Sequence, residues 1–152
     1  MFTNIICCVN LTENGQDVID YTKQIAAPDA MIYVVHALPS TAQLSGYIHS
    51  TAMEEIVKNS EVKTNQYLDG IIAKDFAGYK TQKVITKGNF AHELLKLVDK
   101  YCADIVVMGS ISTKGIFNRL LENTSKTVIG EGRVPVLVVP TELSLECTPE
   151  DF

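Results

Sequence analysis

The chain has 152 residues, 46% of them hydrophobic, and a formal net charge of −5. This length suits one domain with a sizeable core. An acidic chain without a run of lysine or arginine lacks the electrostatic footprint that nucleic acid or an anionic membrane requires. No apolar run approaches the roughly 18 residues of a membrane span, and the amino end lacks signal-peptide flanks. We therefore expect a cytoplasmic protein without nucleic-acid or membrane partners.

The first half of the chain predicts strand, helix, strand and long helix. Thr3 to Val9 is an apolar run typical of a strand, and Met31 to Val35 is a second one, bounded by Pro28 and Asp29. Between them, one helical face carries Val18, Tyr21, Thr22 and Ile25. Thr51 to Phe76 predicts a long helix with a polar middle. Its expected buried positions are Met53, Ile56, Val57, Leu68, Ile71 and Ile72.

The second half repeats the alternation. Tyr79 to Ile85 predicts a third strand, and Lys87 to Asn89 a turn with a helix cap. The helix after it carries Ala91, Leu94, Leu95, Val98 and Tyr101 at helical spacing. Ile105 to Met108 predicts a fourth strand, Ile116 to Ile129 a helix and Val134 to Val139 a fifth strand. Strands separated by helices predict an α/β fold, a three-layer doubly wound sandwich around a five-stranded parallel sheet of order 3-2-1-4-5.

We expect residues 1–140 to form a single domain and residues 141–152 an acidic tail. The tail contains four acidic side chains and no basic ones. Its apolar residues Leu143, Leu145 and Phe152 are expected to hold it to the domain or to a partner subunit.

Enzymatic and metal-binding motifs are absent, so we expect no catalytic residue and no metal site. His92 and Glu93 lack the second histidine of a zinc helix, and the glycines after Met108 lack a P-loop ending. His36, at a strand end, is interpreted as a hydrogen-bonded structural residue, and His49 as a loop residue.

The cysteines show no metal or disulfide spacing. Cys7 and Cys8 are adjacent in a strand and point to opposite faces, while Cys102 and Cys147 are isolated. Buried or inert thiols are the favoured interpretation. A redox sensor based on Cys8 is a third, weaker hypothesis, because Cys8 ends the first strand beside the presumed site.

The chain resembles the universal stress protein family over nearly its whole length. The resemblance rests on Asn4 to Thr12, Val34 to Ala37, Gly88, and above all Asp104 to Ser110 and Val134 to Pro140. It implies an adenine-nucleotide alpha-hydrolase-like fold. Independently of the resemblance, the predicted strand order places a ligand site where the first and fourth strands end, which is the switch point of such a sheet.

Nucleotide-binding members of this family carry Gly, two residues, Gly, nine residues and then Gly-Ser or Gly-Thr. Here Gly109 matches, but Ser112 and Glu122 replace the next two glycines and Asn123 replaces the hydroxyl residue. Asn10 stands where the family has an aspartate. The implied pocket comprises Cys8, Val9, Asn10, Ala37, Met108, Gly109, Ser112, Glu122, Asn123, Thr124 and Ser125.

Glu122 is the most consequential replacement. At about 4 Å and an effective dielectric near 20, a carboxylate repels one phosphate charge by ~4 kcal/mol, roughly a thousandfold in affinity. The favoured hypothesis is therefore a dimeric stress-response interaction or signalling module that has no cofactor and is not an enzyme. The alternative is a switch that binds ATP or AMP with Mg²⁺ and hydrolyses slowly at most, with a cradle formed by Asn10, Gly109, Thr124 and Ser125.

The last strand predicts the assembly. It is apolar and forms an edge of the predicted sheet, which a stable protein rarely leaves unpaired. The resemblance likewise implies a homodimer formed through this strand; other protein partners are not identified. The edge consists of Val134, Val136, Leu137, Val138 and Val139.

Overall fold

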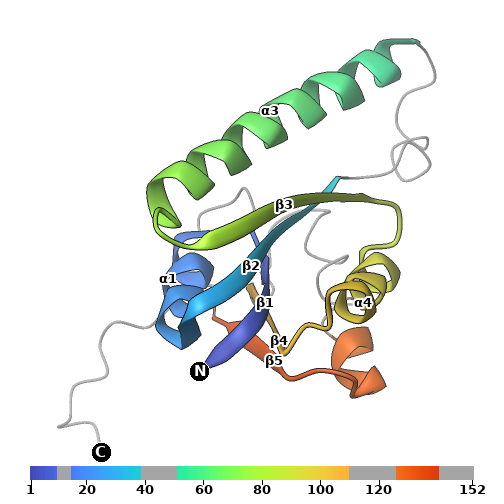
Figure 1. Ribbon diagram of the computed structural model, residues 1–152. Coiled ribbons are helices and arrows are strands. Elements are labelled where there is room, and N and C mark those ends of the chain that lie inside the picture. The colour runs from blue at the N-terminus through green and yellow to red at the C-terminus, as the bar shows by residue number, and fades with distance from the viewer. Residues whose placement is uncertain (10–14, 39–50, 110–125, 141–152) are drawn as a thin grey trace, which may run out of the picture.

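The centre of the fold is a five-stranded parallel sheet with the strand order β3-β2-β1-β4-β5 (Figure 1). The computed structural model describes residues 1–9, 15–38, 51–109 and 126–140. The strands are β1 (Phe2–Cys8), β2 (Ala26–Leu38), β3 (Lys80–Lys87), β4 (Ile105–Gly109) and β5 (Val136–Val139). The predicted fold class and strand order are confirmed.

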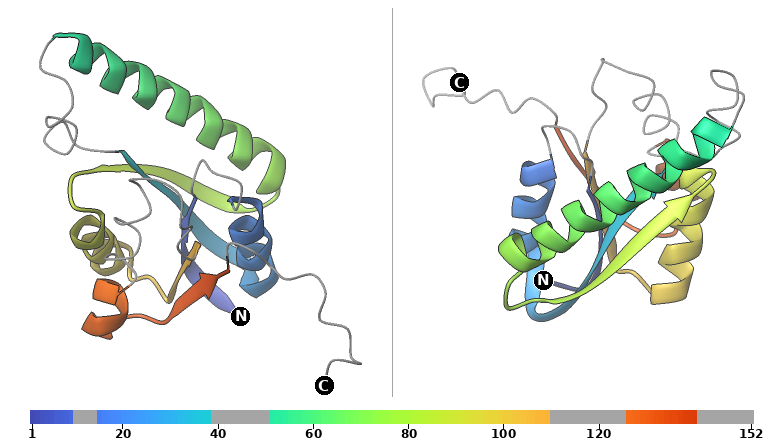
Figure 2. Two further views of the ribbon diagram at one scale, coloured as in Figure 1. Left: turned by 180° about the vertical axis from the view of Figure 1, so that it is seen from behind. Right: turned by 90° about the horizontal axis from the view of Figure 1, so that it is seen from above.

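Helices cover both faces of the sheet. They are α1 (Gly15–Ile25), α3 (Thr51–Asp75) and α4 (Phe90–Tyr101), and residues 126–131 are also helical. One apolar cluster joins α1 and α3 to the sheet, and a second joins α4 and Val128 to its other face (Figure 2). The expected start of the last helix, residues 116–125, lies outside the described residues, as do residues 141–152.

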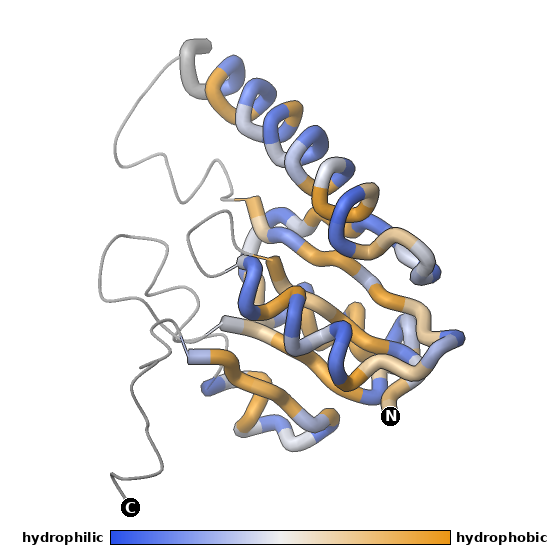
Figure 3. Tube along the Cα trace, turned by 90° about the vertical axis from the view of Figure 1, so that its left-hand side faces the viewer, coloured by the Kyte–Doolittle hydropathy of each residue, from blue (hydrophilic) through white to orange (hydrophobic). Residues whose placement is uncertain are grey.

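β1 is the most deeply buried part of the sheet. The side chains of Ile5 and Cys7 lie in the cluster on the α1 side, and those of Ile6 and Cys8 in the cluster on the α4 side. A strand buried on both faces reads as a continuous apolar run rather than an alternating one. Figure 3 shows hydrophobic residues along the strands, whereas α3 is largely hydrophilic.

β2 starts five residues earlier than expected. The sequence predicted a strand from Met31 with Pro28 outside it, but β2 begins at Ala26, which pairs with Phe2. The register between β1 and β2 shifts before Asn4, and Pro28 falls in this irregular part. Proline has no N–H to donate, and it is tolerated there because a residue in a bulge need not donate a hydrogen bond to the neighbouring strand. The prediction of Pro28 as a boundary was therefore wrong.

α3 confirms the predicted length but not all the predicted buried positions. Leu68 and Ile71 are buried, whereas Ile56 is 49% exposed. A 25-residue helix is about 37 Å long and the eight residues of β3 span about 26 Å, so α3 extends beyond the sheet at its amino end. Ile56 lies in that overhang. In contrast, Thr64 in the polar middle is buried, because this part of α3 lies against the sheet.

Two ion pairs fix α3 on β3. Lys83 Nζ lies 2.8 Å from Asp69 Oδ1, and Lys87 Nζ lies 3.2 Å from Glu61 Oε2. Both pairs are partly exposed to solvent, so each contributes at most about 1 kcal/mol. The two pairs show the direction of the helix. From Lys83 to Lys87 along β3, their partners on α3 run backward from Asp69 to Glu61, so α3 is antiparallel to β3.

A carboxylate joins the amino ends of β1 and β4. Asp104 Oδ2 accepts hydrogen bonds from Thr3 N (3.1 Å), Thr3 Oγ1 (2.7 Å) and Asn4 N (2.9 Å). In return Asp104 N donates to Asn4 O at 2.8 Å. The hydrogen bonds from Thr3 and Asn4 lower the pKa of Asp104 below its usual value. Residues a hundred positions apart are thereby fixed in register.

We expect Asp104→Asn to lower the melting temperature at neutral pH. Loss of the charged acceptor costs about 1 kcal/mol at this exposed position, or about 2–4 °C. Because folding lowers the pKa of Asp104, its stabilisation is present above the unfolded pKa of about 3.9 and is lost as pH falls through the lower folded pKa. Thermal unfolding of both proteins from pH 7 down to pH 3 checks this.

The matched control is Asp29→Asn. Asp29 is an exposed carboxylate on β2 for which the described residues provide no hydrogen-bond donor. Its substitution should leave the pH profile of the wild type unchanged. A difference between wild type and Asp104→Asn that stays constant at all pH values would contradict the assigned role of the charge.

Candidate functional site

The carboxyl ends of β1, β2 and β4 meet at one edge of the sheet. β1 lies between β2 and β4, with Cys8 opposite Val35 and Cys7 opposite Val107. The chain leaves β1 toward β2 through α1 on one face and reaches β4 through α4 on the other. The junction between β1 and β4 is therefore the topological switch point, where open parallel sheets bind ligands.

Five predicted pocket residues are described, and the structure brings them to this edge. Cys8, Met108 and Ala37 belong to the cluster on the α4 side, and Val9 to the cluster on the α1 side. A Cβ added to Gly109 would lie 3.7 Å from Val18 Cγ2, an ordinary contact. The described packing thus tolerates a side chain at position 109. None of the five residues carries a charge.

Six predicted pocket residues and two other predicted residues lie outside the described residues. The pocket residues are Asn10, Ser112, Glu122, Asn123, Thr124 and Ser125; the others are His49 and Cys147.

His36 connects the ends of β1 and β2. Its Nδ1 lies 2.8 Å from Val9 O, and Val9 N donates to Val35 O at 2.9 Å. Burial lowers the pKa of His36, with the bond to Val9 opposing this shift. A neutral ring that donates from Nδ1 keeps Nε2 as an acceptor. The prediction that His36 forms a structural hydrogen bond is confirmed. Its partner, Val9, could be identified only from the pairing of β1 with β2.

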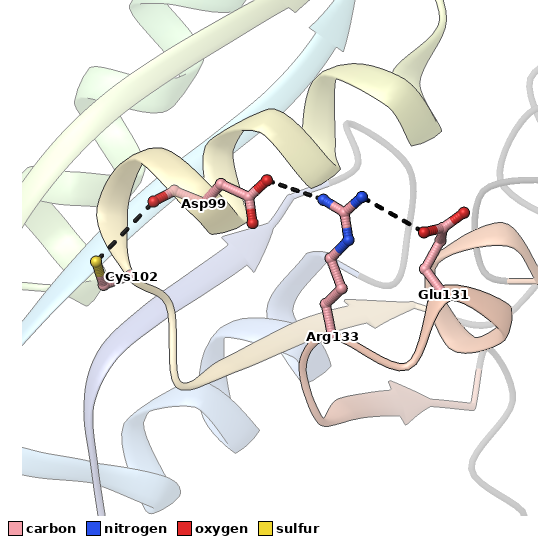
Figure 4. Close-up of polar contacts among 4 residues, drawn as sticks. All are labelled: Asp99, Cys102, Glu131 and Arg133. Atoms are coloured by element: carbon pink, nitrogen blue, oxygen red, sulfur yellow. Dashed lines mark hydrogen bonds and ion pairs between the residues drawn. The ribbon is translucent and has the colours of Figure 1, made fainter.

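Burial makes the two thiols at the site, Cys7 and Cys8, unreactive. Burial raises the pKa of Cys7 to about 12, and burial together with the neighbouring Cys7 raises the pKa of Cys8 further. A redox sensor needs an accessible thiolate. This environment opposes the hypothesis of a sensor based on Cys8. Cys102 differs: it is exposed at the end of α4, and its Sγ lies 3.9 Å from Asp99 O (Figure 4).

Within the described part of the chain, a metal site would require a cluster of ligand side chains, and a membrane span would require a long apolar helix. There, no three side chains of His, Cys, Asp and Glu come together as metal ligands. No helix among the described residues is long and apolar enough to cross a bilayer.

We expect the buried thiols to resist alkylation. In a Cys102→Ser, Cys147→Ser variant, iodoacetamide should add nothing to the native protein and should label both Cys7 and Cys8 after unfolding in guanidinium, because thiolate and access are then restored. Mass spectrometry of the intact protein counts the labels. The wild type, which keeps the exposed Cys102, is the positive control. Labelling of Cys8 in the native variant at the rate of a free thiol would refute the assignment.

Comparison with known proteins agrees with this geometry. The model of the Universal stress protein family matches residues 1–140. Universal stress protein G of Escherichia coli O157:H7 is 24% identical over 142 residues, covering 91% of this chain and 99% of that protein.

Solved structures show the same fold. The hypothetical protein MJ0577 superimposes with a TM-score of 0.76 at 18% identity, covering 95% of this chain and 99% of that one. A universal stress protein in complex with cAMP gives a TM-score of 0.58 at 19% identity, covering 93% and 98%. With a family match over nearly all of its length and the switch-point architecture described above, the chain belongs to the universal stress protein family.

Proposed function

We propose that this universal stress protein is a dimeric stress-response interaction or signalling module that does not bind ATP tightly and is not a catalyst. The observation that carries this proposal is the replacement of the residues that would hold phosphate.

Two features of the site support weak phosphate binding. In sequence, Ser112, Glu122 and Asn123 occupy three of the four positions of the family's phosphate-binding pattern. In the structure, the described pocket residues at the ends of β1, β2 and β4 are uncharged, and burial favours a neutral His36 beside them. A polyphosphate needs donors and positive charge to replace its hydration. The described side of the pocket provides no cation for this.

The second candidate is a nucleotide switch. A universal stress protein of the same fold has been solved with cAMP, and Met108 and Gly109 keep their place at the end of β4. Asn10, Thr124 and Ser125 would then supply the polar groups of a rearranged cradle for ATP or AMP with Mg²⁺. On this hypothesis Glu122 weakens the site without abolishing it.

The two edges of the sheet support dimerisation through β5. β3, at one edge, carries Lys80, Lys83 and Lys87 and is joined to α3 by two ion pairs. β5, at the other edge, has only apolar side chains, and Val138 is 37% exposed. Lysines protect an edge strand from pairing, whereas a flat apolar edge favours it. A twofold axis beside β5 would hide both copies of this edge.

The segment before β5 is anchored to α4. Arg133 lies 2.8 Å from Asp99 and 3.5 Å from Glu131 (Figure 4). Val134, which the sequence assigned to the strand, is buried just before β5 begins at Val136. These contacts fix the direction in which β5 enters the sheet. Among the described residues only β4 pairs with β5, so the outer edge of β5 can pair with a second copy.

We expect ATP with magnesium to leave the melting temperature of the wild type unchanged at millimolar concentration. A site filled a hundredfold above its Kd would add about 2.7 kcal/mol, or about 5–11 °C. The matched variant is Ser112→Gly, Glu122→Gly, which restores two glycines of the family pattern and removes the repulsive charge. Differential scanning fluorimetry with ATP, AMP and cAMP measures all three nucleotides in the same way.

The outcomes separate the two candidate functions. No shift in the wild type supports the interaction module. A clear shift in the wild type would overturn the proposal, and a larger shift in the glycine variant would identify a weakened nucleotide site.

We expect Val138→Lys to convert the dimer into a monomer. A lysine on each copy would place two charges at the shared edge and bury them unpaired. Sedimentation equilibrium gives the mass, and circular dichroism confirms that the variant is folded. The control is Val62→Lys on α3, which replaces a more exposed valine (56%) far from β5 in the sequence and on another element. A dimer that survives Val138→Lys, or a wild type that is already monomeric, would contradict the proposed interface.

A further inference from the structure

The amino end of α4 has donors that the described protein leaves unused. β3 leads into α4 through Gly88, whose φ of +99° suits glycine, and through the N-cap residue Asn89. The Asn89 side chain accepts a hydrogen bond from His92 N at 3.1 Å, and Asn89 O accepts one from Glu93 N at 3.0 Å. The Asn89 side chain thus satisfies one donor of the first turn, His92 N, and the bond from Glu93 N is the first i→i−4 bond of the helix.

The two donors before His92 are the N–H groups of Phe90 and Ala91. Neither has a hydrogen-bond acceptor among the described residues. Both residues are buried, at 6% and 8% exposure. Adjacent free N–H groups at the start of a 12-residue helix combine donors with the positive end of the helix dipole.

A buried hydroxyl lies near the start of α4, on the side of the sheet that α4 covers. Thr86 is 6% exposed, and its Oγ1 has no hydrogen-bond partner among the described residues. Val84, two residues earlier on β3, belongs to the α4-side cluster, so Thr86 also points to the α4 side. It pairs in register with Ala37, which belongs to that same cluster. Since buried hydroxyls are normally bonded, an unused one marks a place where a ligand group would be favourable.

The charges around this end do not oppose an anion strongly. Glu93 in the first turn pairs with Lys96 at 3.2 Å, and His92 beside it is exposed. Lys87 is directed to Glu61 on the other face of the sheet. The single carboxylate of the first turn therefore has a cation of its own.

We propose that the start of α4 and Thr86 form a binding site for a small oxyanion, a phosphate or carboxylate group. The N–H groups of Phe90 and Ala91 and the Thr86 hydroxyl donate to its oxygens. The site lies where β3 joins α4, beside Ala37 of the candidate pocket. Its donors are not residues of the turn after β4, so it does not rest on the proposed function.

Inorganic phosphate is the probe, added to the full chain at constant ionic strength with chloride as reference. We expect the amide resonances of Phe90 and Ala91 to shift in a saturable way in two-dimensional NMR spectra. The melting temperature should rise by about 3–6 °C at a phosphate concentration roughly ten times the Kd. Parallel titrations with acetate and AMP distinguish a carboxylate, a free phosphate and a nucleotide phosphate as the preferred form.

Thr86→Val removes only the hydroxyl and should weaken phosphate binding roughly tenfold. Thr64→Val is the matched control, because Thr64 on α3 is, within the described ranges, the other buried threonine whose hydroxyl lacks a partner. It should bind phosphate like the wild type. Thr86→Ser, which keeps the hydroxyl, should retain binding if Thr86→Val does not fold. Absence of shifts at Phe90 and Ala91, or equal phosphate binding by both valine variants, would overturn the proposal.

Discussion

The position of β1 between β2 and β4 is the constraint on which the rest of the structure depends. Its side chains are buried on both faces, and both of its backbone edges are paired. Moving a charge into this strand would leave it without water or a partner. Because β1 is central, α1 and α4 must lie on opposite faces. The ends of β1 and β4 therefore meet between two crossover helices that lie on opposite faces of the sheet.

The same topology separates two chemical environments at the carboxyl edge. Around Cys8 and Met108 the described surface is apolar and uncharged, which suits packing more than it suits phosphate. Where β3 joins α4, backbone donors and a buried hydroxyl find no partner in the part of the chain that the structure describes. The net charge of −5 gives no hint of this difference. Affinity for an anion is set by local donors and burial, and a global excess of acidic residues does not preclude it.

The two edges of the sheet also have different roles. β3 combines lysines with a covering helix, and its ion pairs to α3 hold that helix in one direction. β5 is short and apolar, and its approach is anchored on α4 through Arg133. Charged side chains keep an edge strand from pairing with another chain, whereas an apolar edge strand favours such pairing. The contrast explains why assembly is expected at β5.

The sequence by itself determined the order of elements, the fold class and the family. These follow from short-range signals: apolar runs in β1 and β4, helical spacing in α4, and the Asn89 cap. The sequence also predicted the meeting of Cys8, Ala37 and Gly109 at one edge, because parallel strands of known order align their ends.

Only the tertiary structure decided which polar and apolar side chains are exceptions to those patterns. Ile56 is exposed because α3 is longer than the strand beneath it, and Thr64 is buried because that part of the helix lies on the sheet. The hydrogen bonds of Asp104 to Thr3 and of His36 to Val9 join residues far apart in sequence. The unpaired hydroxyl of Thr86 is visible only once its neighbours are placed. Each depends on which surfaces meet, and periodicity within one element carries no information about that.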